Sequence, residues 1–176
     1  MKRALAVAAM TALLAPCLAL AAPLKKLKVV ETTTIKAPID KVWDTVKDFN
    51  SLDKWHPAIA KDEIVKGTNN EVGAVRQLSV KDGPNLTEKL VAFNDAGHSF
   101  TYRILESPFP IKHYVSTLHL TALKDGSTKV TWAGTFTRKN PSDNPPEAEN
   151  DDAGVKLITG VYQGGLSNLK KILEGG

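Results

Sequence analysis

Cysteine is almost absent from this chain of 176 residues, and familiar catalytic motifs are missing from it. A single cysteine, Cys17, cannot build a disulfide framework. The four histidines do not fall at zinc-ligand spacings, and the chain has no phosphate-binding loop, dinucleotide fingerprint or nucleophile elbow. We therefore predict no metal and no cofactor.

The first 21 residues have the three regions of a secretory signal peptide. Two basic residues precede an apolar stretch, and Ala19 and Ala21 supply the small residues before the cleavage point. Cleavage after Ala21 would remove Cys17 and leave one domain, residues 22–176, which we expect in the periplasm. A membrane anchor is one alternative, although the apolar stretch is short for a span. A lipoprotein is another, but Pro16 is a poor neighbour for its cysteine.

The chain also has little excess of one charge over the other. The formal net charge is +4, and loss of the two basic residues in the leader leaves 21 basic against 19 acidic residues, or +2. Nucleic-acid-binding domains normally carry strongly basic, clustered surfaces. The composition therefore argues against a nucleic-acid partner and favours an ordinary globular domain with a packed core.

The remaining sequence alternates between strand and turn signals. A first strand over Val29–Ile35 precedes a short amphipathic helix begun by Pro38 and a second helical turn over Ser51–Trp55. Six more strand-like stretches follow, separated by turn residues at hairpin spacing: Ile59–Lys66, Gly73–Lys81, Leu86–Phe93, Ser99–Glu106, Lys112–Leu123 and Ser127–Arg138.

The C-terminal part changes period. Residues 139–152 hold three prolines and five acidic residues, which predicts a mobile surface loop. From Val155 onward, apolar residues recur at helical spacing to the end of the chain. We predict an α+β fold: a curved seven-stranded antiparallel sheet around a long C-terminal helix, with two short helices after the first strand.

Several short motifs carry a resemblance to a known family. With this element order, Ala37-Pro38, Trp55-His56-Pro57 and Gly165-Leu166-Ser167-Asn168-Leu169 resemble the START-like helix-grip (SRPBCC) superfamily, in particular its polyketide cyclase/dehydrase type. The resemblance implies a cavity between sheet and helix for hydrophobic molecules. With its signal peptide, the chain is also similar to MxaD-type periplasmic proteins, which implies an accessory role beside methanol dehydrogenase and its cytochrome.

Strand alternation selects the residues that face such a cavity. Arg76 shares its face with Leu78, and Glu88 shares its face with Leu86. If the Asp82-Gly83 turn pairs Leu78 with Leu86, Arg76 lies opposite Glu88, and a buried charge pair is expected. The same reasoning turns four polar or aromatic side chains inward, namely Tyr102, Tyr114, Ser116 and Trp132.

Two further candidates precede the second strand. Trp55 and His56 would lie near one mouth of the cavity, where Trp55 can gate it and His56 can exchange a proton. They can equally be structural, with Trp55 filling the end of the barrel and His56 capping a turn. His113 and His119 should face outward. The candidate ligand-binding residues are thus Trp55, His56, Arg76, Glu88, Tyr102, Tyr114, Ser116 and Trp132.

Three functions compete on this basis. The first is a non-enzymatic periplasmic accessory protein that docks through its charged surface to a dehydrogenase and a cytochrome. The second is a carrier of a hydrophobic small molecule, anchored by Arg76. The third, least favoured, is a cyclase or dehydratase in which Glu88 or His56 moves a proton. A filled core, in which the Arg76–Glu88 pair is only structural, is the alternative to an open cavity.

Overall fold

A single curved sheet forms the body of the molecule in this computed structural model, which describes residues 23–175. The signal peptide predicted for residues 1–21 lies outside the described residues. The seven strands are antiparallel in the order β1-β7-β6-β5-β4-β3-β2. Their bounds are β1 Leu27–Ile35, β2 Ile59–Lys66, β3 Val75–Val80, β4 Asn85–Asn94, β5 Ser99–Glu106, β6 Ile111–Ala122 and β7 Thr128–Arg138.

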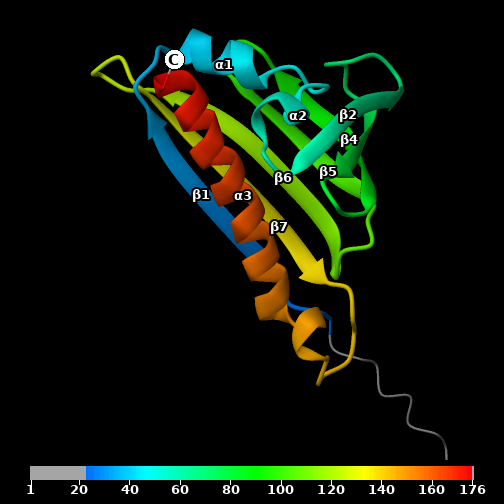
Figure 1. Cartoon of the computed structure of the whole chain (residues 1–176). Helices are drawn as coiled ribbons and strands as arrows, with labels where there is room; N and C mark the ends of the chain where they lie inside the picture. Colours follow the sequence, from blue (N-terminus) through cyan, green and yellow to red (C-terminus); the bar gives the residue numbers. More distant parts are fainter. Residues whose placement is uncertain (1–22, 176) are drawn as a thin grey trace, which may run out of the picture.

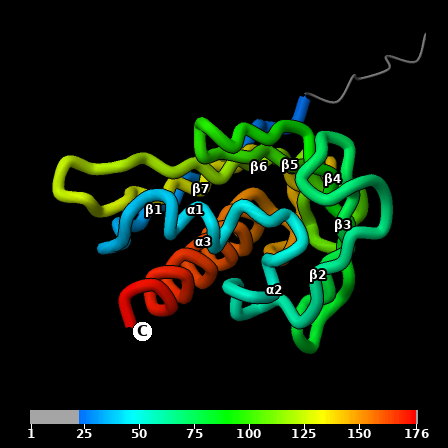
Figure 2. The backbone as a smooth tube through the Cα atoms, turned by 90° about the horizontal axis from the view of Figure 1, so that it is seen from above, coloured from blue at the N-terminus to red at the C-terminus, as the bar shows by residue number. Residues whose placement is uncertain are grey.

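The helices lie together on the concave side of this sheet. The long helix α3, Asp151–Glu174, crosses β1 and β7 (Figure 1). The short helices α1, Ile39–Val46, and α2, Leu52–Trp55, connect β1 to β2. Viewed from above, the sheet curves from β1 round to β2 with α3 inside the curve (Figure 2). The predicted fold class is confirmed. Within residues 23–175, no helix is long and apolar enough to span a membrane.

The C-terminal helix begins earlier than its apolar pattern indicates. Asn150 caps it by accepting a hydrogen bond from the Ala153 backbone N–H at 2.8 Å, so α3 starts at Asp151 rather than near Val155. The preceding segment also contains a 3₁₀ turn, Glu147–Glu149. Arg138 binds the carbonyls of residues 140 and 142 and, at 3.0 Å, the Asp151 carboxylate. Part of the predicted 139–152 loop is therefore helical.

The turn between β3 and β4 sets the register of the site. Asp82 adopts a left-handed backbone conformation, with φ of 52°, in the turn that joins the two strands. Leu78 then pairs with Leu86, and Arg76 with Glu88, as predicted. Strand β2 is less regular, because a register shift lies between Ile59 and Lys61.

Candidate ligand-binding cavity

A cavity of about 280 Å³ lies between the inner face of the sheet and the first half of α3. Its wall is almost entirely carbon. Strands β2 to β7 contribute one side, and α3 contributes Leu157, Ile158 and Val161. The remaining lining residues are Leu52, His56, Ala58, Ile59, Leu78, Val80, Leu86, Glu88, Tyr102, Ile104, Phe109, Ile111, Tyr114 and Trp132.

Five of the eight candidate residues reach this cavity. They are His56, Glu88, Tyr102, Tyr114 and Trp132, and each comes from the element on which the sequence placed it. Trp55, Arg76 and Ser116 do not line it. Trp55 is buried behind Trp132, with their ring centroids 5.5 Å apart. Ser116 is buried and contacts the Tyr162 hydroxyl at 2.7 Å, and Arg76 is held by Glu88, Asp62 and the Phe49 carbonyl.

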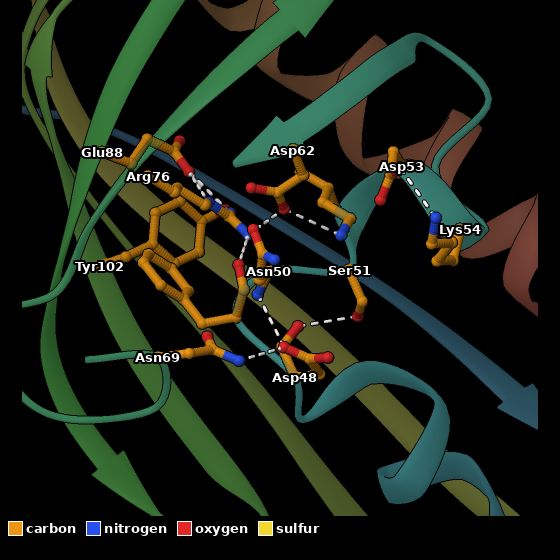
Figure 3. Close-up of polar contacts among 12 residues, drawn as sticks. Asp48, Asn50, Ser51, Asp53, Lys54, Asp62, Asn69, Arg76, Glu88 and Tyr102 are labelled. Carbon is orange, nitrogen blue, oxygen red and sulfur yellow. Dashed lines mark hydrogen bonds and ion pairs between the residues drawn. The ribbon is translucent and has the colours of Figure 1, made fainter. Parts of the chain in front are cut away.

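Arg76 lies at the centre of an ionic cluster, which we define as Arg76, Glu88 and Asp62 (Figure 3). Its Nε and Nη2 donate to Oε2 of Glu88 at 2.9 and 2.7 Å. Its Nη1 donates to Oδ2 of Asp62 at 3.2 Å and to the Phe49 carbonyl at 2.8 Å. The guanidinium also lies over the Phe49 ring, 4.1 Å from its centroid. Arg76 therefore uses four of its five N–H donors within the protein, and its charge is already paired with two carboxylates.

Burial and opposite charge act against each other within the ionic cluster. Burial lowers the pKa of Arg76, but Glu88 and Asp62 outweigh it and raise that pKa above its ordinary value. Burial raises the pKa of Glu88, and Arg76 opposes that rise. Burial also raises the pKa of Asp62 to about 6, although Arg76 and the Leu52 backbone N–H lower it. Asp62 is thus the member that gains a proton on mild acidification.

His56 has both ring nitrogens occupied. The Ala58 backbone N–H donates to Nδ1 at 3.2 Å, which leaves Nε2 to donate to the Val161 carbonyl at 2.9 Å. Burial lowers the pKa of His56, and the Arg76 charge lowers it further against the effect of the Val161 carbonyl. A neutral ring with no spare nitrogen joins α2 to α3. It presents no group that can exchange a proton with a ligand in this arrangement.

A hydroxyl chain runs through the wall from the sheet to α3; we use this name for Tyr102, Tyr114, Tyr162 and Ser116. Nε1 of Trp132 donates to the Tyr102 hydroxyl at 2.9 Å, and the Tyr102 and Tyr114 hydroxyls are 3.5 Å apart. Tyr114 contacts Tyr162 at 2.8 Å, and Tyr162 contacts Ser116 at 2.7 Å. Ser116 then donates to the Ala133 carbonyl at 3.1 Å.

Burial keeps this hydroxyl chain neutral. It raises the pKa of Tyr102 to about 12, with a further rise from the Glu88 charge. It also raises the pKa of Tyr114 and of Tyr162 well above the ordinary value for tyrosine. Hydrogen bonds between neutral groups, rather than charges, therefore connect the polar atoms of this part of the wall, in contrast to the ionic cluster.

Two glycines allow α3 to approach the sheet closely enough for these contacts. A Cβ on Gly134 of β7 would overlap the Tyr162 hydroxyl. A Cβ on Gly165 of α3 would lie 2.6 Å from the His56 ring and 2.8 Å from the Trp132 ring. The Trp132 and Tyr162 rings stack at 4.6 Å between their centroids, with 11° between their planes. The half of the sheet–helix interface next to the cavity is thus densely filled.

Asp62 and Tyr162 are site residues that the sequence reasoning missed. Asp62 points inward together with Ile59, although the two are three positions apart, because the register shift in β2 reverses the alternation. Tyr162 falls within the apolar helical pattern that begins at Val155, and that pattern does not indicate what its hydroxyl contacts. A glycine within a strand, such as Gly134, often marks a close approach by another group and was the available signal.

Comparison with known proteins places this architecture in a family. The model of the polyketide cyclase/dehydrase and lipid transport family matches residues 26–174. The chain belongs to this family. Its fold is the START-like helix-grip (SRPBCC) fold of proteins that bind hydrophobic ligands.

Relatives of this chain come from plants and bacteria. It is 30% identical over 144 residues to the abscisic acid receptor PYL10 of Arabidopsis thaliana, a match that covers 80% of this chain and 75% of the receptor. A Bacillus thuringiensis structure is 31% identical with a TM-score of 0.72, covering 84% of this chain and 99% of that one. The ZhuI aromatase/cyclase of Streptomyces sp. R1128, at 21% identity and a TM-score of 0.68 over 85% and 94% of the chains, shares the fold.

Proposed function

We propose that this protein binds a small, largely apolar molecule in the cavity between α3 and the sheet. The main support for this proposal is a cavity of about 280 Å³ whose wall is almost entirely carbon, within an otherwise closely packed core. An apolar cavity of about 150 Å³ already holds benzene in other proteins. The volume here is near the lower limit of ordinary ligand sites and suits a molecule of one or two rings.

The acid–base groups at the cavity favour binding over catalysis. Among the described residues that line it, both His56 nitrogens are bonded, and Glu88 is the one carboxylate, paired with Arg76 through Oε2. A reaction that removes a proton at one atom and returns it at another normally needs a second group with a mobile proton beside such a carboxylate. A carrier or sensor needs neither.

Narrowing the cavity should weaken binding strongly. Leu157→Trp places a large side chain at the cavity from a partly buried position of α3, so the helix need not shift. Leu173→Trp is a matched control, because Leu173 is a partly buried position of the same helix that does not line the cavity. Binding of the neutral fluorophore N-phenyl-1-naphthylamine should fall at least about tenfold in Leu157→Trp and remain in Leu173→Trp.

Equal binding by both variants would contradict the cavity as the site. Native mass spectrometry of the unmodified protein from its own cells supplies an independent test. A retained mass below about 1 kDa, lost in Leu157→Trp, is the expected result. The wild-type protein should bind the fluorophore with a stoichiometry of one.

We also propose that the protein acts in the periplasm, as the leader pattern of residues 1–21 suggests. Cell fractionation should recover a chain that begins at residue 22 in the periplasmic fraction. A full-length chain in the cytoplasm would contradict this proposal.

An MxaD-type accessory role, docking to a periplasmic dehydrogenase and cytochrome, is a second candidate supported by surface charge. Asp151 is paired with Arg138, and Glu149 accepts a hydrogen bond from Asn140 at 2.7 Å. The exposed carboxylates of Asp143, Glu147 and Asp152 remain available for a partner. Replacing these three by Asn, Gln and Asn should weaken partner binding and remove its dependence on ionic strength. Unchanged binding would exclude this surface.

A further inference from the structure

The cavity has one polar atom that the protein leaves without a donor. Glu88 accepts both Arg76 bonds through the same oxygen, Oε2. No described residue donates a hydrogen bond to its other oxygen, Oε1, which points away from Arg76 in Figure 3. Glu88 lines the cavity, and Oε1 does not belong to the fully enclosed side-chain atoms that lack a hydrogen-bond partner, so part of its surface is accessible. This oxygen can therefore accept a hydrogen bond from a molecule in the cavity.

The hydroxyl chain offers few free hydrogen-bond donors to a molecule in the cavity. Ser116 gives its hydrogen to the Ala133 carbonyl, so Tyr162 must donate to Ser116, and Tyr114 must donate to Tyr162. Tyr102 accepts from Trp132 and has the one loosely held hydrogen, because its hydroxyl is 3.5 Å from that of Tyr114. Tyr102 can thus lend a hydrogen to a ligand oxygen, whereas Tyr114 offers lone pairs.

No cation among the described lining residues is available for an acidic ligand. His56 is buried with both nitrogens bonded, and the Arg76 guanidinium lies outside the lining with four hydrogen bonds to its neighbours. A carboxylate in this cavity would lose its hydration and would face the negative charge of Glu88. Burial of such an unpaired charge is strongly unfavourable.

We infer that the cavity selects a hydrophobic alcohol or phenol whose hydroxyl donates to Oε1 of Glu88, and that it rejects carboxylates. The inference rests on the proposed binding function and specifies its ligand class. A hydroxyl fits both available groups, because it can donate to Glu88 and accept from Tyr102. An unpartnered carboxylate oxygen in an apolar cavity is unfavourable, so a ligand donor gains the strength of a charge-assisted hydrogen bond.

A series of naphthalenes with one varied substituent tests this selection. The probes are 2-naphthol, 2-methoxynaphthalene, 2-methylnaphthalene and 2-naphthoate, which share the apolar rings. A bond to a charged acceptor should make 2-naphthol bind at least about tenfold more tightly than 2-methoxynaphthalene, which keeps the oxygen but has no donor. 2-Naphthoate should bind at least about tenfold more weakly than 2-methylnaphthalene. Isothermal calorimetry measures all four at a pH at which the naphthol is un-ionised.

Glu88→Gln should reverse the ligand preference of the cavity from a hydrogen-bond donor to an acceptor. A merely structural role of Glu88 would not produce this change. Arg76 still requires an acceptor, so the carbonyl of the introduced glutamine should take the place of Oε2 and turn the amide N–H group toward the cavity. The variant should lose the preference for 2-naphthol and gain affinity for the ketone 2-acetylnaphthalene. Thermal unfolding of the variant verifies that it is folded. If it does not fold, the naphthalene series on the wild-type protein decides the question alone.

The outcomes separate the inference from the proposed function. If no naphthalene binds, cavity binding itself is contradicted. If all four bind with similar affinity, the cavity binds apolar molecules, but the assignment of Glu88 is overturned. Tighter binding of 2-naphthoate than of 2-methylnaphthalene would also overturn it, because the acid would then have found a cation.

Discussion

The ionic cluster and the hydroxyl chain are both buried polar groups beside the same cavity, but they are built differently. The ionic cluster comes from three neighbouring strands, β2, β3 and β4. The hydroxyl chain joins the sheet to α3, because Tyr162 of α3 bonds to Ser116 and Tyr114 of β6, which lie 46 and 48 positions earlier in the sequence. One group depends on local register, and the other depends on how closely a distant helix approaches.

Their energetics differ as well. Removing one member of the ionic cluster leaves a buried charge without its partner, whereas removing one hydroxyl leaves a neutral acceptor or donor. The ionic cluster should therefore control stability and its pH dependence. The hydroxyl chain should control the shape of the wall, because its tyrosines do not ionise near neutral pH.

Replacing Arg76 should have the largest effect on folding. Arg76→Leu leaves Glu88 and Asp62 buried without their cation, and the free energy of unfolding should fall by about 3–5 kcal/mol. Urea denaturation measures this loss. Tyr114→Phe, which removes one hydroxyl from the chain, is the comparison and should cost about 1 kcal/mol.

A triple variant separates the charge effect from lost packing. Arg76→Leu combined with Glu88→Leu and Asp62→Asn removes the uncompensated charges, so it should recover much of the stability lost in Arg76→Leu. If the triple variant is as unstable as the single one, the loss comes from packing around Arg76 and not from the unpaired carboxylates.

Gly134→Ala should have an intermediate effect, confined to the hydroxyl chain. The added methyl group would overlap the Tyr162 hydroxyl, and the resulting displacement of α3 should cost about 1–3 kcal/mol. In a Tyr162→Phe background the same substitution should cost much less, because the overlapping atom is gone. Denaturation of the four proteins gives the coupling between the two positions.

Gly160→Ala is the matched glycine control on α3. A Cβ at Gly160 meets nothing within 4 Å, so alanine should stabilise the helix by roughly 0.5–1 kcal/mol. If Gly134→Ala were equally harmless, the close contact between β7 and Tyr162 would not be needed for the native packing.

The same contrast explains what the sequence allows one to predict. The Asp82-Gly83 turn determines the β3–β4 register, so the Arg76–Glu88 pair follows from alternation alone. Asp62 could not be assigned in that way, because an irregular step in β2 reverses its direction. The bonding of His56 depends on a carbonyl 105 residues away, which no local pattern specifies. Strands and neighbouring pairs were therefore predictable, whereas contacts with α3 required the packed structure.

The smallest expected effect is a change in pH dependence produced by Asp62→Asn. The folded-state pKa of Asp62 is raised from 3.8 to about 6, so between these values the folded protein holds a proton that the unfolded chain has lost. The stabilisation from this proton is complete below about pH 4 and is lost as the pH rises through about 6. The asparagine of the variant cannot titrate, and it retains an oxygen for the Leu52 N–H.

Denaturation at about pH 4, 5, 6 and 7 measures the difference in unfolding free energy between wild type and Asp62→Asn. That difference should shift in favour of the wild type as the pH falls through this range, while Tyr114→Phe should show a constant difference from the wild type. The subtraction also removes the opposing contribution of His56, whose lowered pKa makes stability fall on acidification in both proteins. A flat Asp62→Asn difference would mean that burial does not outweigh Arg76 at this carboxylate, and the ionic cluster would then resemble the hydroxyl chain in its response to pH.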